Sequence, residues 1–388
     1  MFEPTLQAAQ AQLEAFLPKA GRDYASKRNF DNGSKKHTDV SQLSPWVRTR
    51  LLPEWTIVKR VLEKHKADAV EKFIDEVCWR TYWKGWLQLR PSIWDDYLDE
   101  LKSQRDSWNN HPRYTAALRQ ESGIECLDAW TKELLETGYL HNHARMWYAS
   151  IWIHTLQLPW TLGAAFFLKH LLDGDPASNT LSWRWVAGLH TPGKTYLARP
   201  DNIRKYTNGR FAVSEPLAGS PLVIDTKLLP SPRLLPELET PPSSLKLGLL
   251  IQEDDLSASK WVREKYEVQN IAGLFLKDIY ENHWIDESVA TFRTKCLKDV
   301  LGSEGDLLQS IDAAVNWAQA NELDAIVMAE IPVGLWNQAI KELETALKQQ
   351  NIQLYFVRPE WDECLHPNAK AGFFRLKKAI PKAIALLS

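Results

Sequence analysis

The hydrophobic pattern of this chain changes once, across a proline-rich segment, and that change limits the folds it can adopt. From residue 1 to about residue 210, apolar residues recur at spacings of three and four, the helical period, and strand patterns are nearly absent. Residues 215–244 are rich in proline, serine and glycine, which indicates an extended linker. Beyond it, apolar runs at 246–251, 325–329 and 352–357 alternate with helical patterns, which predicts a small α/β domain with a largely parallel sheet.

We therefore expect two domains in a chain of 388 residues, which is longer than a single core usually spans. The predicted boundaries are 1–212 for an all-helical domain, 213–244 for the linker and 245–388 for a smaller α/β domain. Neither G-x-G-x-x-G nor G-x-x-x-x-G-K-[ST] occurs in the last part, so an independent phosphate-binding loop is not predicted there.

Charge and cysteine content narrow the class of protein. Residues 1–210 hold 29 Lys and Arg against 24 Asp and Glu, and the remainder holds 18 against 25, so a basic first part precedes an acidic second part. This asymmetry is a weak indication of a nucleic-acid-facing first domain. The four cysteines form no C-x-x-C pair, and the N-terminus has no apolar signal core. We expect a reducing compartment such as the cytoplasm, and no metal site.

One uncharged stretch, residues 146–168, could be mistaken for a membrane span. Pro159 interrupts it, so we expect two buried helices and no membrane association. The chain also has 18 tryptophans, thirteen of them between Trp46 and Trp185. A core built on large aromatic rings would explain that excess without any special function.

Two predicted helix faces carry ligand-binding types of side chain. Asn142, Arg145 and Met146 share one face, and a buried arginine there needs a carboxylate, for which the turn 173–175 is a candidate. Taken alone, this face could also be an ordinary polar surface. On a second helix Glu76, Trp79, Arg80 and Trp83 lie on one face, where a ring beside a carboxylate could stack on a base, although tryptophan at this spacing more often belongs to a core.

Four motifs in these regions resemble signatures of the photolyase/cryptochrome family. Gly138-Tyr-Leu-His-Asn-His-Ala-Arg-Met146 is similar to GW-x-HN-x-x-RM. Asp173-Gly-Asp-x-Ala-x-Asn179, followed by Trp183-x-Trp185, resembles DGD-x-A-x-N…W-x-W. Ser41-Gln-Leu-Ser-Pro45 is similar to the TSRLSP phosphate loop, and Glu76-Val-Cys-Trp-Arg80 to EL-x-WR. The four occur in family order, and the resemblance covers Tyr24 to about Arg210, the FAD-binding domain of the family.

The resemblance implies a set of residues that hold FAD, namely Tyr24, Ser41, Leu43, Ser44, Arg80, Asn142, Arg145, Asp173, Asp175 and Asn179. The first five would lie near the diphosphate. Arg145 would pair with Asp173 beside the isoalloxazine ring, where its charge favours the reduced anion. Asp175 would accept a ring N–H, and Asn179 would face the flavin N5.

The resemblance also implies a substrate site and an electron relay. The residues matching positions that contact a flipped-out pyrimidine dimer in repair enzymes are Glu76, Trp79, Asn142 and Met146. The residues matching the family's relay of indole rings are Trp183, Trp160 and Trp108. The alternative is that these three rings are ordinary core aromatics.

The chain departs from the family pattern at several positions, namely Val40, Phe73, Tyr139, Thr81 and His143. The last stands where repair enzymes often carry an arginine near DNA, which puts tight DNA binding in doubt. The order of the parts departs as well, because family members usually begin with the α/β antenna domain, whereas here it would follow the helical one. A second, antenna chromophore is compatible with the resemblance, but no residue can be named for it.

Three functions follow from the resemblance. The first is a deoxyribodipyrimidine photolyase, a lyase that splits cyclobutane pyrimidine dimers in damaged DNA, single-stranded DNA included, by electron transfer from reduced FAD under blue light. The second is a cryptochrome-like blue-light photoreceptor, which would signal to a protein partner. The third is a light-independent flavoprotein that kept the fold.

Overall fold

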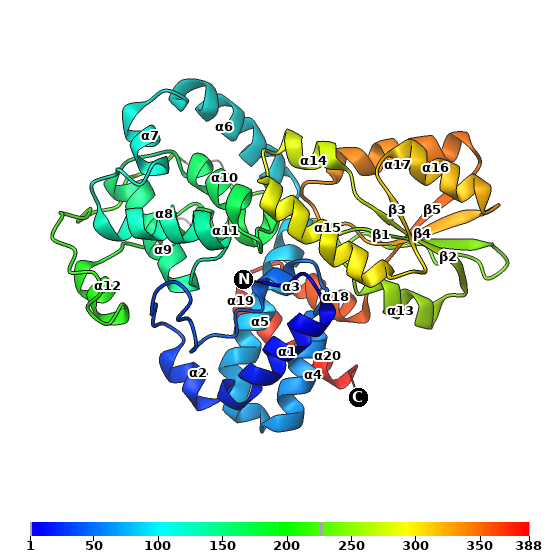
Figure 1. Ribbon diagram of the computed structural model, residues 1–388, viewed down its shortest axis with the longest axis horizontal. Coiled ribbons are helices and arrows are strands. Elements are labelled where there is room, and N and C mark those ends of the chain that lie inside the picture. Colours follow the sequence, from blue (N-terminus) through cyan, green and yellow to red (C-terminus); the bar gives the residue numbers. More distant parts are fainter. Residues whose placement is uncertain (1, 192, 226–227, 388) are drawn as a thin grey trace.

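The computed structural model describes residues 2–191, 193–225 and 228–387. The first part of the chain is helical, as predicted, and forms the left and lower parts of the view in Figure 1. Its helices are α1 (Leu6–Phe16), α2 (Arg22–Lys27), α3 (Ser44–Arg48), α4 (Glu54–Lys64), α5 (Ala67–Gln88), α6 (Ser92–Trp108), α7 (Pro112–Leu118), α8 (Glu125–Thr137), α9 (Asn142–Ser150), α10 (Trp160–His170), α11 (Pro176–Val186) and α12 (Pro200–Tyr206), with a 3-10 turn at η1 (Leu17–Lys19) and a π-helical turn at η2 (Ile151–Thr155).

A parallel sheet follows residues 213–244, as predicted, and it has five strands where the sequence indicated three. Its strands are β1 (Leu247–Ile251), β2 (Val268–Leu274), β3 (Asp306–Leu308), β4 (Ala325–Ala329) and β5 (Gln353–Val357), in the order β3-β2-β1-β4-β5. The helices between them are α13 (Ala258–Lys265), α14 (Lys277–Asn282), α15 (Glu287–Leu301), α16 (Ile311–Ala320) and α17 (Asn337–Gln349). Strand order reverses between β1 and β4, which makes this a doubly wound sheet with a switch point there.

The last helices return to the helical part of the molecule. They are α18 (Glu360–Leu365), the 3-10 turn η3 (His366–Asn368), α19 (Phe373–Lys377) and α20 (Ile380–Ala385). They pack on α4 and α5, so red and blue segments lie together in Figure 1. Trp361 Nε1 donates to Thr81 Oγ1 at 3.1 Å, and the Tyr82 hydroxyl donates to the Ala371 carbonyl at 2.9 Å. The boundaries 1–212, 213–244 and 245–388 stay a prediction.

Two helix ends fix the backbone around the motifs. Gly138 ends α8 in the left-handed conformation at φ 65°, and a Cβ there would lie 2.7 Å from the Leu172 side chain. Asp175 caps α11 by accepting from the Ser178 N–H at 3.0 Å, with Pro176 in the first turn. These two ends bring the 138–146 and 173–179 motifs side by side.

The uncharged stretch 146–168 is divided between α9, η2 and α10, with Pro159 immediately before α10. Its side chains are mostly buried in the core, as predicted. Among the helices that the structure describes, none is both long and apolar enough to cross a membrane.

Candidate flavin site

A cavity of about 820 Å³ lies within the helical half, and such a volume suits a small-molecule ligand. Its wall includes every residue that the sequence predicted for FAD or for a lesion, namely Tyr24, Ser41, Leu43, Ser44, Glu76, Trp79, Arg80, Asn142, Arg145, Met146, Asp173, Asp175 and Asn179. Residues up to 155 positions apart in the sequence therefore line one space. Their individual roles stay predictions.

Arg80 brings a guanidinium group to this wall. Its Nη2 donates to the Arg48 carbonyl at 3.0 Å, and its Nε, which forms no hydrogen bond within the described residues, lies 3.7 Å from Glu54 Oε1. Burial lowers the pKa of Arg80, while nearby Asp175 and Glu54 oppose that effect. A guanidinium group in a cavity wall suits an anionic ligand such as a phosphate.

The loop before α3 is held in place beside Arg80. The amide of Gln12 donates to the Ser41 carbonyl at 2.8 Å, and that of Gln42 to the His37 carbonyl at 3.0 Å. Gln42 itself has a positive φ of 54°, a backbone conformation that residues other than glycine seldom adopt. The hydroxyl-bearing Ser41 and Ser44 are thereby fixed in the cavity wall.

A guanidinium–carboxylate pair lies in another part of the wall. Arg145 binds Asp173 through two hydrogen bonds, Nη1 to Oδ1 at 3.0 Å and Nη2 to Oδ2 at 2.8 Å, and its Nε donates to the Leu140 carbonyl at 2.8 Å. The structure thus brings together the two residues expected to pair. Such a two-point contact orients the positive charge and holds it beside the cavity.

Asp175 and Asn179 complete this polar region. Burial alone would raise the pKa of the Asp175 carboxyl, but neighbouring Arg80, Lys84 and Arg48 hold it well below its usual range. It is therefore a carboxylate that can accept hydrogen bonds. The Asn179 amide donates to the Ala164 carbonyl at 2.8 Å, which orients the group and leaves its oxygen for another partner.

Aromatic rings form the apolar part of the wall. Trp79 is stacked on Phe373 of α19, with ring centroids 4.2 Å apart and planes 12° apart. Trp83 and Trp185 also line the cavity, and Trp185 stacks on Tyr196 at 5.7 Å. Trp83 shares the predicted helix face of Glu76 and Trp79, whereas no role at the site was predicted for Trp185 or Phe373. The W-x-W spacing was a signal for Trp185, whereas nothing local could connect Phe373 to Trp79.

One departure from the family pattern, His143, and one residue predicted to bind the lesion, Glu76, concern charge near the cavity. His143 stacks on Trp147 at 4.0 Å, its Nδ1 bonds to the Asn29 carbonyl at 2.9 Å, and burial lowers its pKa. It therefore does not replace the arginine charge usual at this position. Glu76 is engaged with Arg28 at 3.1 Å.

The predicted relay is only partly adjacent to the cavity. Trp183 lines it and packs edge-on against Phe167 at 5.1 Å and Trp152 at 6.3 Å. Among the described ring contacts, Trp160 contacts Tyr97 and Trp108 contacts His111, so neither contacts another member of the predicted relay. The relay stays a prediction, and Trp152 enters as a second candidate for the ring next to Trp183.

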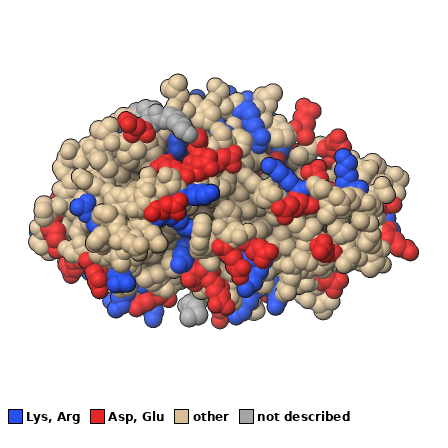
Figure 2. All heavy atoms as spheres, turned by 90° about the horizontal axis from the view of Figure 1, so that it is seen from above, with Lys and Arg blue, Asp and Glu red and all other residues tan. Residues whose placement is uncertain are grey.

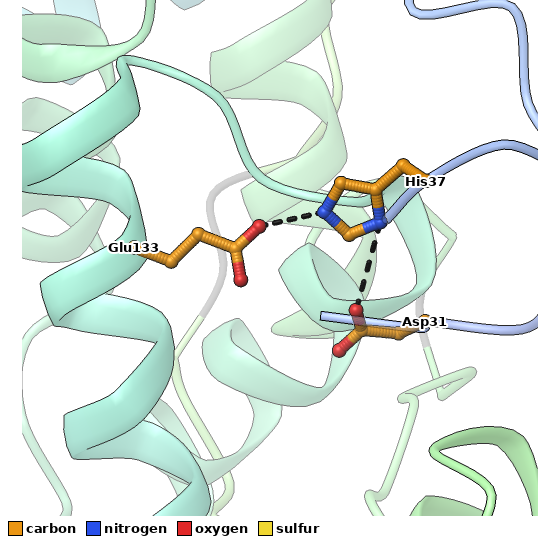
Figure 3. Close-up of side chains that lie close together, drawn as sticks. All are labelled: Asp31, His37 and Glu133. Atoms are coloured by element: carbon orange, nitrogen blue, oxygen red, sulfur yellow. Dashed lines mark hydrogen bonds and ion pairs between the residues drawn. The ribbon is translucent and has the colours of Figure 1, made fainter. Parts of the chain in front are cut away.

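A buried histidine links the loop before the cavity to α8 (Figure 3). His37 Nε2 lies 2.7 Å from Glu133 Oε1, and its Nδ1 lies 3.8 Å from Asp31 Oδ1. Asp31 also accepts from Trp130 and Arg210. One ligand atom from each of these three buried residues lies within 4.8 Å of the others, so the group could hold a metal ion, which the sequence did not lead us to expect. Through its contacts with Asp31 and Glu133, His37 also ties residues 31–37 to α8.

Surface charge on the face seen from above is mixed. Figure 2 shows acidic and basic side chains interspersed there, with no continuous basic track. That face therefore offers no extended positive surface for a nucleic-acid backbone.

Residues 73–208 match the family described as the FAD binding domain of DNA photolyase. The deoxyribodipyrimidine photo-lyase of Vibrio cholerae is 26% identical over 196 residues, which are 49% of this chain and 41% of that protein. That of a Synechococcus species is 31% identical over 192 residues, 48% of this chain and 39% of that protein. The crystal structure of a bacterial class III photolyase from Agrobacterium tumefaciens is also similar, with 27% sequence identity and a TM-score of 0.45. The matched region is 53% of this chain and 43% of the photolyase chain. The chain thus spans less than half the length of the relatives it matches.

Proposed function

We propose that this chain, a member of the photolyase/cryptochrome family through the FAD-binding domain in its helical half, is a light-dependent enzyme that splits cyclobutane pyrimidine dimers in DNA. The observation that carries the proposal is the convergence on one cavity of the residues expected for FAD and those expected for a lesion. The names of the curated relatives support the same activity.

The residues of the cavity fit a flavin dinucleotide. The guanidinium group of Arg80 and the hydroxyls of Ser41 and Ser44 suit a diphosphate, and the Arg145–Asp173 pair with Asn179 suits a polar ring system. When bound, FAD supplies light-driven transfer of one electron, the chemistry by which a dimer can be split.

The protein's own side chains would then hold charge and shape around the reacting groups. Arg145, fixed by Asp173, places a positive charge that stabilises negative charge in the cavity. Trp79, backed by Phe373, offers a rigid flat wall for a base extruded from the helix. Glu76 at the same wall would accept hydrogen bonds from a base edge.

We expect the replacement of Trp79 by alanine to weaken binding of dimer-containing single-stranded DNA by about 1–3 kcal/mol, the value of one stacked base. Trp79→Leu keeps apolar bulk without a flat ring and should lose about as much. Trp284→Ala is the matched control, because that ring is half exposed and lies in the other part of the chain. Affinity is measured by fluorescence anisotropy in the dark, and repair by recovery of thymines under blue light.

A cryptochrome-like photoreceptor is the second candidate, favoured by the partly buried His143, whose lowered pKa leaves it without a positive charge toward DNA at neutral pH. If the FAD-loaded, reducible protein repairs no dimers at saturating concentration, the photoreceptor function replaces the enzyme. Unchanged dimer affinity in both Trp79 variants would show that this ring is not the lesion wall.

A further inference from the structure

An arginine from the α/β part of the chain reaches the turn that carries the two acidic residues of the cavity. Arg293 of α15 is fully buried, and its Nη2 donates to the Gly174 carbonyl at 2.7 Å. Arg48 at the end of α3 donates to the same carbonyl through Nε at 2.9 Å. Two guanidinium groups, one from each part of the chain, therefore bind one backbone oxygen.

This carbonyl lies between Asp173, which holds Arg145, and Asp175, which caps α11. The turn lies so close to the end of α10 that a Cβ on Gly174 would be 2.9 Å from the Leu171 carbonyl oxygen and 3.1 Å from that of Leu168. The turn is thus packed between the last turn of α10 and the two arginines. Its position determines where both carboxylates meet the cavity.

A carboxylate at the end of β1 holds the two arginines in turn. Glu253 Oε1 lies 3.5 Å from Arg293 Nη1 and 3.8 Å from Arg48 Nη2, and Tyr280 donates its hydroxyl to the other carboxylate oxygen. Arg48 Nη1 also binds Asp254 Oδ1 at 2.5 Å. Burial raises the pKa of Glu253, while the neighbouring Arg293 and Arg48 oppose the rise.

The place of these contacts in the sheet is informative. Doubly wound sheets usually bind their ligands outside the carboxyl ends of the strands, at the switch point, which here lies between β1 and β4. In this chain, side chains of the helical half bind residues at that edge of the sheet. Arg50 binds Asp255, which follows β1, and Gln88 binds Glu330, which follows β4. The edge that would serve a ligand is engaged in holding the helical half.

We propose that Arg293 is a positioning residue of the flavin site, through which the α/β part of the chain sets the geometry and charge of the Asp173–Asp175 turn. The proposal rests on the proposed function only in that FAD occupies the cavity. It predicts that the reduction potential of bound FAD and its affinity depend on a side chain of α15 that does not line the cavity.

Four purified full-length variants test this, namely Arg293→Met, Arg293→Lys, the double variant Arg293→Met with Glu253→Gln, and Arg263→Met. The last is the matched control, an exposed arginine of α13 paired only with the exposed Glu304 among the described contacts. The readouts are the dissociation constant for FAD, the absorption band shape of the bound flavin and its midpoint potential. Circular dichroism checks that each variant is folded.

We expect Arg293→Met to bind FAD about tenfold or more weakly, the effect of losing a hydrogen bond from a charged group. Its midpoint potential should fall, because a buried positive charge is lost while Glu253 remains. The double variant should recover the potential, since the charge balance returns, but not the affinity, since the Gly174 contact is still missing. Arg293→Lys should recover the potential and part of the affinity.

A folded Arg293→Met protein with the wild-type potential, band shape and affinity would overturn the inference. If that variant does not fold, Arg293→Gln, which keeps an N–H donor but removes the charge, should still lower the potential, and a wild-type potential in folded Arg293→Gln would overturn the inference equally. Failure of the wild type to bind FAD would instead overturn the proposed function. The two failures are therefore distinguishable.

Discussion

Replacing Trp183 by phenylalanine is expected to abolish light-driven reduction of bound FAD by external donors while leaving FAD in place. Trp183 lines the cavity and is almost fully buried, so its indole ring can pass an electron from the rings behind it to a flavin in the cavity. Phenylalanine keeps the apolar bulk but is much harder to oxidise than indole. The measurement is the loss of oxidised-flavin absorbance under blue light with a reductant present.

Trp185→Phe is the matched control, since Trp185 is two residues away, lines the same cavity and stacks on Tyr196 instead of Trp152. It should be reduced at close to the wild-type rate. Undiminished reduction in Trp183→Phe would remove this residue from the relay.

The same assay decides which ring follows Trp183. The resemblance points to Trp160, whereas the ring contact at 6.3 Å points to Trp152. Loss of reduction in only one of Trp160→Phe and Trp152→Phe identifies the second carrier.

Replacing Arg50 by methionine is expected to lower the free energy of unfolding by about 3–5 kcal/mol at pH 7, the cost of breaking a buried ion pair from one side. Arg50 is buried and binds Asp362 through two hydrogen bonds of 2.7 Å, as well as Asp255 and Glu54 at 3.1 Å. Methionine leaves these carboxylates buried without their cation. Urea denaturation followed by circular dichroism measures the loss.

The deficit should depend on pH in a defined direction. Burial alone would raise the pKa of Asp362, but Arg50 holds it well below its usual range. A depressed pKa contributes stability above the unfolded value of about 4, and this contribution is lost as pH falls through the folded pKa. Without Arg50 that contribution is absent, so the gap between wild type and variant should narrow from pH 7 toward pH 3.

Arg60→Met provides the comparison, because Arg60 pairs with Glu14 and Glu63 on the exposed surface. It should change stability little at any pH. An Arg50 deficit as small as that of Arg60, or one that grows on acidification, would contradict the role given to the buried network.

The sequence predicted those parts of the fold that depend on patterns within a short segment, and missed those that depend on contacts between distant residues. Apolar runs identified β1, β4 and β5 within one residue. The strands β1 and β4 are central and buried on both faces, whereas β5 lies at the edge of the sheet and is only partly buried but still has an apolar sequence. The strand β2 includes Gln269 and Asn270 and is only partly buried, and β3 has three residues, so neither was expected. The return of α18–α20 to α5 depends on contacts such as Trp361 with Thr81, which no local pattern encodes.

The site divides in the same way. Residues within motifs, such as Arg145 and Asp173, could be paired in advance because a buried arginine requires a carboxylate. Arg293 could not be found, since its partner is a backbone carbonyl 119 positions away, and carbonyls leave no mark in the sequence. Trp152 was hidden among many similar rings.

Equilibrium titration of the purified chain with FAD, beside riboflavin as the analogue without phosphates, tests the central claim most directly. Occupation of the helical cavity predicts one FAD per chain, and weaker binding of riboflavin because the phosphates that would meet Arg80, Ser41 and Ser44 are then missing. A chain that binds neither compound, or binds both equally well, would contradict the assignment of this cavity to a flavin dinucleotide.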